Sequence, residues 1–166
     1  MKRKLVLSVL LLFIIISTAF IALKKEEEDE VHIHAAFHVY RDGKLFDFAD
    51  FKYMHIMPCN EDEEQHKDDP LDRAHLHDLN GEIVHVHAHG VVWGDLFQNL
   101  SFSFNGPVTG YSNGEFIENI LDKPIESYER VLLGEGEITY IEEKLEKLPS
   151  IDEIKEVEKL SESCGN

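Results

Sequence analysis

The chain of 166 residues has 33 acidic and 16 basic side chains, a formal net charge of −17, and 43% hydrophobic residues. The acidic excess argues against nucleic acid as a partner, because a phosphate backbone is bound through basic surfaces. Roughly 140 residues remain once the apolar N-terminus is set aside, which is the length of one domain.

The N-terminus has the pattern of a membrane signal-anchor. Lys2, Arg3 and Lys4 precede an uncharged apolar run over residues 5–23, long enough to cross a bilayer core of ~30 Å as a helix. The basic flank favours a cytoplasmic N-terminus, with the rest of the chain outside the cytoplasm. A cleaved signal peptide, with Ser17-Thr18-Ala19 as its cleavage site, is the alternative. Both interpretations predict an extracytoplasmic domain, and the first predicts a single-pass protein of the cell membrane.

We therefore expect four parts along the chain. They are a transmembrane signal-anchor (residues 1–24), a charged linker (25–30), a His-rich, β-rich extracytoplasmic domain (31–136), and C-terminal helices with a polar tail (137–166).

Alternating apolar and polar residues predict the first strand, Val31 to Arg41. Side chains two residues apart on a strand share a face, so His32, His34 and His38 lie together on the face opposite Phe37. Asp42-Gly43 is typical of a hairpin turn, and Lys44 to Phe48 is the expected return strand.

The segment Ala74 to Ala88 predicts a second hairpin, and the faces of its strands fix its register. A two-residue Asn80-Gly81 turn would mix histidines with apolar residues on each face. A three-residue loop, Leu79-Asn80-Gly81, sets His75 opposite His85 and leaves Gly81 in the left-handed position. One face then carries five histidines: His75, His77, His85, His87 and His89.

The rest of the chain predicts one helix, further strands and a helical tail. Apolar residues at helical spacing predict a helix over Val92 to Leu100. Strands are expected at Phe102–Phe104, Val108–Ser112, Glu115–Ile120 and Arg130–Leu133. In the tail, residues 137–148 are helical in pattern, and Ser150 with Glu153 forms a capping box for a second helix.

The order of these elements from His75 to Gly134 resembles the β-grasp (ubiquitin-like) arrangement. The predicted fold class is therefore α+β, a β-grasp-like mixed sheet packed on one helix. A transmembrane helix and an added N-terminal hairpin would precede it, and a C-terminal helical pair would follow it.

The histidines carry the predicted chemistry, since seven of the ten fall in three His-x-His units. Two imidazoles from positions i and i+2 of a strand, ~6.5 Å apart, can share one ion, and a residue of the paired strand can complete the site. Imidazole ligands suit Zn²⁺ or Cu²⁺. The expected main site is His75, His77, His85 and His87, with His89 able to substitute. A second candidate set is His32, His34 and His38, which would join the first only if their strand lies beside the hairpin.

Other polar residues carry weaker predictions. His55 is expected at the boundary of the core, and His66 in a solvated acidic loop. Asp78 either orients an imidazole from behind or begins the turn. Cys59 and Cys164 form a possible disulfide outside the cytoplasm, with Cys59 as a metal ligand near His55 as the competing hypothesis.

Several segments resemble an uncharacterised family of short, His-rich single-pass membrane proteins of small-genome bacteria and archaea. They are His-Ile-His-Ala-Ala-Phe-His-Val-Tyr, Lys-Tyr-Met-His-Ile-Met-Pro-Cys, Ala-His-Leu-His-Asp, Val-His-Val-His and the ending Ser-Glu-Ser-Cys-Gly. Some members carry an automatic label of protein-disulfide isomerase. That activity is not expected here, because this chain has no CxxC motif.

The sequence thus favours a membrane-anchored, extracytoplasmic module that binds, buffers or delivers a transition metal. The alternative is an extracytoplasmic enzyme, either a zinc-dependent hydrolase or a thiol-disulfide protein using Cys59 and Cys164. A third hypothesis is an interaction domain whose histidines sense pH.

Overall fold

The computed structural model describes residues 31–55 and 73–161. Its strands are β1 (Ile33–Arg41), β2 (Lys44–Leu45), β3 (Ala74–His75), β4 (Ile83–Val86), β5 (Val108–Ser112), β6 (Glu115–Ile117) and β7 (Arg130–Glu135). Its helices are the 3-10 helices η1 (Phe51–Tyr53) and η2 (Ile120–Asp122) and the α-helices α4 (Trp93–Asn99), α5 (Ile141–Glu146) and α6 (Ile151–Ser161).

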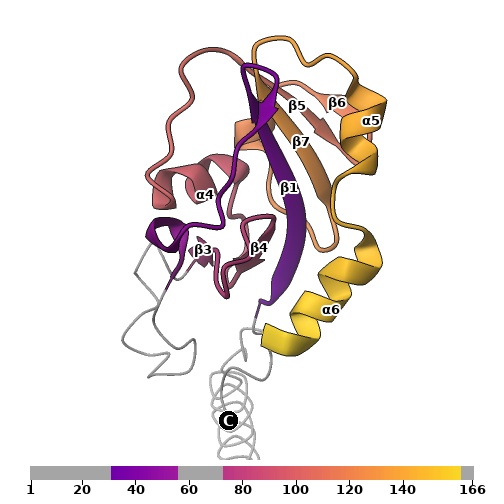
Figure 1. Ribbon diagram of the computed structural model, residues 1–166. Helices are drawn as coiled ribbons and strands as arrows, with labels where there is room; N and C mark the ends of the chain where they lie inside the picture. The colour runs from indigo at the N-terminus through magenta and orange to yellow at the C-terminus, as the bar shows by residue number, and fades with distance from the viewer. Residues whose placement is uncertain (1–30, 56–72, 162–166) are drawn as a thin grey trace, which may run out of the picture.

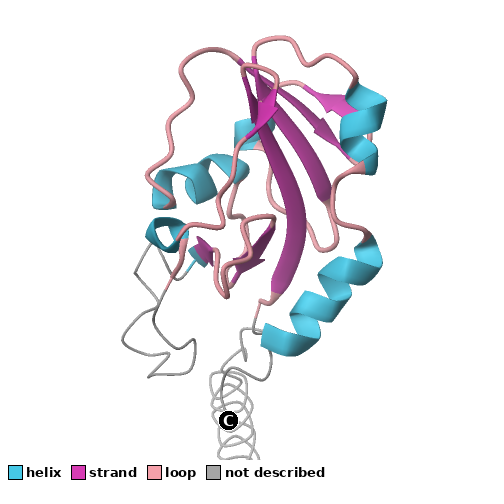
Figure 2. Cartoon of the chain, in the orientation of Figure 1, coloured by secondary structure: helices cyan, strands magenta, loops and turns pink. Residues whose placement is uncertain are grey.

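The strands form one mixed sheet with helices on both faces (Figures 1 and 2). The strand order is β3-β4-β1-β7-β5-β6, and β2 pairs with β1 alone. Helix α4 covers one face, and α5 and α6 lie on the other. The predicted α+β class with a mixed sheet is confirmed.

Strand β1 lies at the centre of the sheet. It pairs antiparallel with β4, where Ala35 is opposite Val84, and parallel with β7, where Phe37 is opposite Val131. Seven consecutive residues of β1 are buried, as expected for a strand with neighbours on both edges and helices on both faces. The N-terminal hairpin is therefore not an addition to the sheet, because its first strand joins the two halves.

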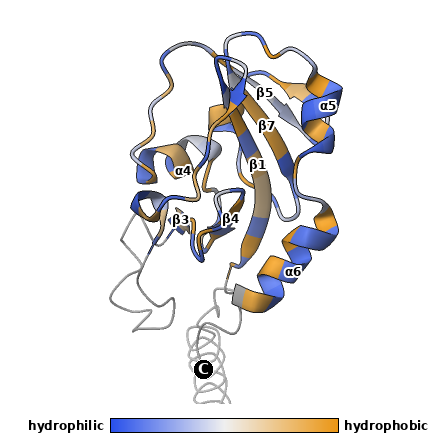
Figure 3. Ribbon diagram, viewed as in Figure 1, coloured by the Kyte–Doolittle hydropathy of each residue, from blue (hydrophilic) through white to orange (hydrophobic). Residues whose placement is uncertain are grey.

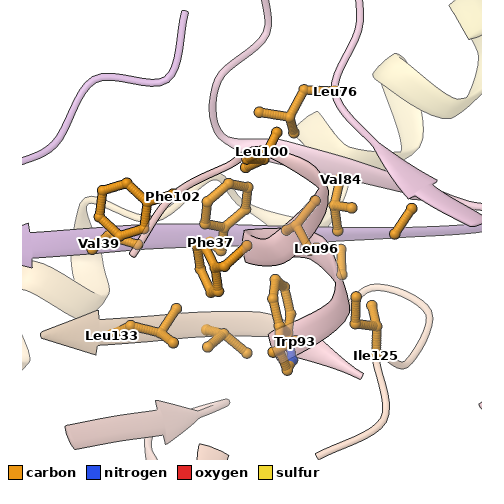
Figure 4. Packing of buried hydrophobic residues seen from close by; sticks show 14 of the residues in the cluster. Phe37, Val39, Leu76, Val84, Trp93, Leu96, Leu100, Phe102, Ile125 and Leu133 are labelled. Carbon is orange, nitrogen blue, oxygen red and sulfur yellow. The ribbon is translucent and has the colours of Figure 1, made fainter. Parts of the chain in front are cut away.

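The main core lies between the sheet and α4 (Figure 4). Phe37 of β1 and Leu133 of β7 face Trp93 and Leu96 of the helix. Trp93, which starts the helix, is fully buried. The helix predicted over residues 92–100 is confirmed to within one residue at each end, because burial of its apolar side chains follows the helical period.

The opposite face is covered by the C-terminal helices. Ile154 of α6 packs against Ala36 of β1 and Ile83 of β4. Hydrophilic and hydrophobic stretches alternate along α6, as expected for a helix with one face on a sheet (Figure 3). The predicted capping box begins this helix: Ser150 N donates to Glu153 Oε2 at 2.7 Å, and Glu153 N donates to Ser150 Oγ at 3.3 Å.

The hairpin of β3 and β4 has the predicted register but a different turn. His75 is opposite His85, as the alternation of faces required. The left-handed residues, however, are Asp78 and Leu79, with φ of 58° and 56°, and His77 O accepts from Asn80 N at 3.0 Å. Gly81 is not in the left-handed region. A residue without a side chain is required at this position because the backbone of another segment passes close to it: a Cβ on Gly81 would lie 2.5 Å from Ala49 N.

The remaining elements divide between confirmed and corrected predictions. β5 has the predicted bounds, β7 extends two residues beyond its prediction, and the return strand β6 is shorter, ending at Ile117. Phe102–Phe104 is not a strand; Phe102 N donates to Phe97 O at 2.9 Å, and its side chain packs against α4.

Several predictions fall outside the described residues. They concern the anchor at 1–24, the linker at 25–30, His66, and the pair Cys59 and Cys164. Among the helices of residues 31–55 and 73–161, none is long and apolar enough to cross a membrane.

Candidate metal centre

Three histidines form a row across three adjacent strands. His75 of β3 is directly opposite His85 of β4, and His85 is directly opposite His34 of β1. β3 and β4 lie beside the lower part of the long strand β1 (Figure 1). The first strand therefore does lie beside the hairpin, which is the arrangement in which the two candidate sets of ligands merge.

His85 is the centre of this arrangement. Five imidazoles lie around its ring, with centroid separations of 4.8 Å to His32, 4.3 Å to His34, 5.3 Å to His75, 5.1 Å to His77 and 4.2 Å to His87. Because side chains two residues apart on a strand share a face, the His-x-His spacing places these rings on one side of the sheet.

His55 also belongs to the arrangement, although we expected it only at the boundary of the core. Its ring centroid lies 4.8 Å from that of His75. The chain holds it there through a hydrogen bond from His55 N to Leu76 O at 2.7 Å, and Met54 bridges to Leu76 in parallel. No local sequence pattern predicts the contact between His55 and His75. The histidine cluster is thus His32, His34, His55, His75, His77, His85 and His87.

The core of the cluster is shielded from water. His34, His75 and His85 are exposed by only 1%, 4% and 2%. Burial lowers the pKa of His34 and that of His87 to about 4, and it is the largest cause of the strongly lowered pKa of His85. Neighbouring imidazoles lower these pKa values further, because positive charges so close would repel. These three rings are therefore neutral at pH 7, the form that binds metal ions.

A carboxylate fixes the orientation of one ring. His77 Nδ1 lies 2.5 Å from Asp78 Oδ2, and His77 Nε2 lies 3.0 Å from His85 Nδ1. A carboxylate only accepts hydrogen bonds, so His77 Nδ1 carries a proton and donates to Asp78. When His77 Nε2 is unprotonated, it accepts from His85 Nδ1. Asp78 is thus both a turn residue and the group that orients His77, and the two sequence hypotheses for it hold together.

In that arrangement His85 Nδ1 carries the proton of the ring, and His85 Nε2 carries its lone pair. His85 Nε2 is buried and has no hydrogen-bond partner among residues 31–55 and 73–161. A buried acceptor without a partner is unfavourable by about 1–3 kcal/mol. The arrangement therefore presents an unused donor atom for a cation at the centre of the cluster.

Within the described part of the chain, two groups of three histidines could hold a metal ion. They are His32, His85 and His87, and His34, His77 and His85; within each group the three ligand nitrogens lie within 4.8 Å of one another. A bound ion at ~2.0–2.1 Å from each nitrogen sets the nitrogens roughly 3.3–3.6 Å apart, so a pair at the 4.8 Å limit would have to approach by more than about 1 Å. His85 is the one residue that both groups share.

A second negative charge approaches from α6. Glu158 counteracts the lowering of the His34 pKa through its charge, and its Oε2 accepts a hydrogen bond from Tyr128 Oη at 2.8 Å. The backbone of Tyr128 in turn donates to His34 O at 2.8 Å. The sequence could not indicate this neighbour, because it depends on how α6 packs on the sheet.

Two of the predicted ligands lie elsewhere. His38 shares the face of His34, but the pairing of β1 with β4 stops at Ala36, which is opposite the first residue of β4. His38 therefore lies beside the residue before β4, and its Nε2 is 2.9 Å from Glu82 Oε1. His89 is exposed in the turn after β4. Neither belongs to the groups of three found among the described residues, and the predicted ligand His75 is outside these groups too, although its ring lies in the histidine cluster.

Comparison of the chain with protein-family models, with curated proteins and with solved structures gave no match. The geometry of the histidine cluster therefore carries the functional argument.

Proposed function

We propose that this protein binds a transition metal ion, Zn²⁺ or Cu²⁺, in its histidine cluster, and that it buffers or delivers that metal. The observation that carries the proposal is His85. It is buried at the centre of five other imidazoles. One nitrogen is hydrogen-bonded to His77, which Asp78 orients, and the other has no partner in the part of the chain that the structure describes.

The donor set supports the choice of metal. The ligands available in the two groups are imidazole nitrogens, which suit Zn²⁺, Cu²⁺ and Ni²⁺, whereas Ca²⁺ and Mg²⁺ require oxygen ligands. The Asp78–His77 pair adds the carboxylate that metal-binding histidines use to fix ring orientation. The thiol-disulfide alternative rests on Cys59 and Cys164, outside the described residues.

Titration of the purified full chain with Zn²⁺ and Cu²⁺, measured by isothermal calorimetry, tests the proposal. We expect the double substitution His75→Ala and His85→Ala to remove most of the affinity, by more than the ~10–100-fold that follows loss of an orienting group alone. Both side chains face away from the core packed on α4, so circular dichroism should show that the fold survives. The matched control is His89→Ala, an exposed histidine outside the groups of three. Equal affinity in the double variant and the parent would refute the site.

We further propose that residues 1–24 anchor the protein in the cell membrane, with the metal-binding domain outside the cytoplasm. The three basic residues followed by 19 uncharged ones support this. Protease added to intact cells should remove the domain, and protection of the domain would contradict the proposal.

We also assign the sheet to a β-grasp arrangement. The antiparallel pair β1–β4, helix α4, hairpin β5–β6 and final strand β7 follow the predicted order, with β1 in place of the first strand of the second hairpin. β3 is then an additional edge strand. An experimental structure with a different strand order would overturn the assignment.

A further inference from the structure

We propose that the histidine cluster holds two metal ions and that the imidazole ring of His85 bridges them. This inference rests on the proposed function and deepens it, from a site for one ion to a dinuclear site. The four remaining ligands divide between the ions: His34 and His77 bind one, and His32 and His87 bind the other.

The first argument is the division of ligands. Each group of three brings its ligand nitrogens within 4.8 Å of one another, and the groups have only His85 in common. Two sites that competed for the same ligands would share most of them. Here four of the five histidines belong to one group only, so filling one group leaves two ligands of the other unused.

The second argument is the use of the two nitrogens of His85. Nδ1 lies on the side of His77, 3.0 Å from His77 Nε2. Nε2 is buried, and no described residue offers it a hydrogen bond. An imidazole ring that has lost its N–H proton has an in-plane lone pair on each nitrogen, and the two lone pairs point away from each other, so each nitrogen can serve one ion. The inferred assignment gives Nδ1 to the ion of His34 and His77, and Nε2 to the ion of His32 and His87.

The third argument concerns charge. Two divalent ions joined by one ring would lie about 6 Å apart, because each stands ~2.0–2.1 Å from its nitrogen. Their repulsion must be offset by negative groups. The bridging ring releases its N–H proton to solvent when both nitrogens are coordinated and becomes an anion between the ions. Asp78 behind His77 and Glu158 near His34 add negative charge on the side of the first ion.

Copper stoichiometry of the full chain tests the inference. Cu²⁺ is the probe, with bound metal counted by mass spectrometry after equilibrium dialysis. We expect two equivalents in the parent chain, one in His77→Gln and one in His87→Gln. The control His89→Gln should keep two. One equivalent in the parent, lost in His85→Gln, would overturn the dinuclear site and leave metal binding intact; none in the parent would overturn both proposals.

Electron paramagnetic resonance of the copper-loaded parent chain gives a second readout. Two Cu²⁺ ions joined through one imidazole ring couple antiferromagnetically, so the signal of the fully loaded parent should fall well below that of two isolated ions at low temperature. The signal should return in His77→Gln and in His87→Gln, each with a single ion. Two equivalents with the full, uncoupled signal would show two separate sites and overturn the bridge.

Discussion

His34 and His85 face each other across β1 and β4, with ring centroids 4.3 Å apart, and both are almost completely buried. Protonation of either ring would place a positive charge in a buried site, among several other closely spaced imidazoles and with little water to solvate it. The pair is therefore stable only as long as both rings are neutral or bind a cation together. This relationship links metal binding, pH and stability.

The metal-free protein should lose stability as the pH falls from about 6.5 to about 4. The pKa of His34 is lowered from 6.5 to about 4, chiefly by burial. Between these values the unfolded chain binds the proton and the folded chain does not, so the free energy of unfolding falls as protons are added. For His34 the loss is on the order of 3 kcal/mol. Urea denaturation at pH 7, 6, 5 and 4 in the presence of a chelator measures it.

The variant His34→Asn provides the comparison for this effect. Its unfolding free energy should depend less steeply on pH over the same window, whereas His89→Asn should keep the slope of the parent. An identical slope in His34→Asn and the parent would mean that His34 is not the titrating group.

Removing the carboxylate behind His77 should weaken metal binding without removing a ligand. Asp78→Asn replaces the acceptor that fixes the proton on His77 Nδ1. We expect a loss of ~10–100-fold in Zn²⁺ affinity by calorimetry. Asp42→Asn is the matched control, because Asp42 is also an exposed turn residue with positive φ, at 52°, but lies in the other hairpin. Equal losses in both variants would assign the effect to surface charge.

Metal should raise the melting temperature of the protein, and a chelator should reverse the change. An ion that binds only the folded chain stabilises it by about 2.7 kcal/mol when the free ion is at 100 times its dissociation constant. Differential scanning fluorimetry with Zn²⁺ and then EDTA measures the shift. The variant His85→Gln should show little of it; a full shift in that variant would place the stabilising ion elsewhere.

Gly81→Ala should destabilise the fold by about 1–3 kcal/mol, because the new Cβ would lie 2.5 Å from the backbone nitrogen of Ala49. Gly106→Ala is the control, since a Cβ there meets nothing within 4 Å. Removing that glycine should leave the unfolding free energy unchanged or raise it by about 0.4–1 kcal/mol. Equal urea midpoints for the two variants would contradict the close approach at Gly81.

The sequence predicted those features that depend on local periodicity. The alternation of histidines with apolar residues set His75 opposite His85, and helical spacing placed α4. Ser150 and Glu153 marked the start of α6. In each case the determining contacts lie within a few residues, or within one hairpin, so the pattern contains the information.

The features that the sequence missed depend on long-range packing. β1 was expected as an addition to the sheet, yet it occupies the centre. The sequence of a strand does not show which other strands it pairs with. His55 and Glu158 join the surroundings of the cluster only through the packing of other segments on β3 and β1. The turn at Asp78 and Leu79 replaced the expected loop, since Gly81 was needed for its small size rather than for its backbone conformation.

The central place of β1 also sets the order in which the site can be assembled during folding. β1 pairs in parallel with β7, and the two strands are separated by more than half of the chain. Non-local pairs of this kind form late. β1 is synthesised before the hairpin of β3 and β4, but its second partner in the sheet is complete only when β7 has emerged. High metal affinity is then a property of the fully folded domain. An ion bound earlier by an isolated His-x-His pair has a lower affinity and can exchange.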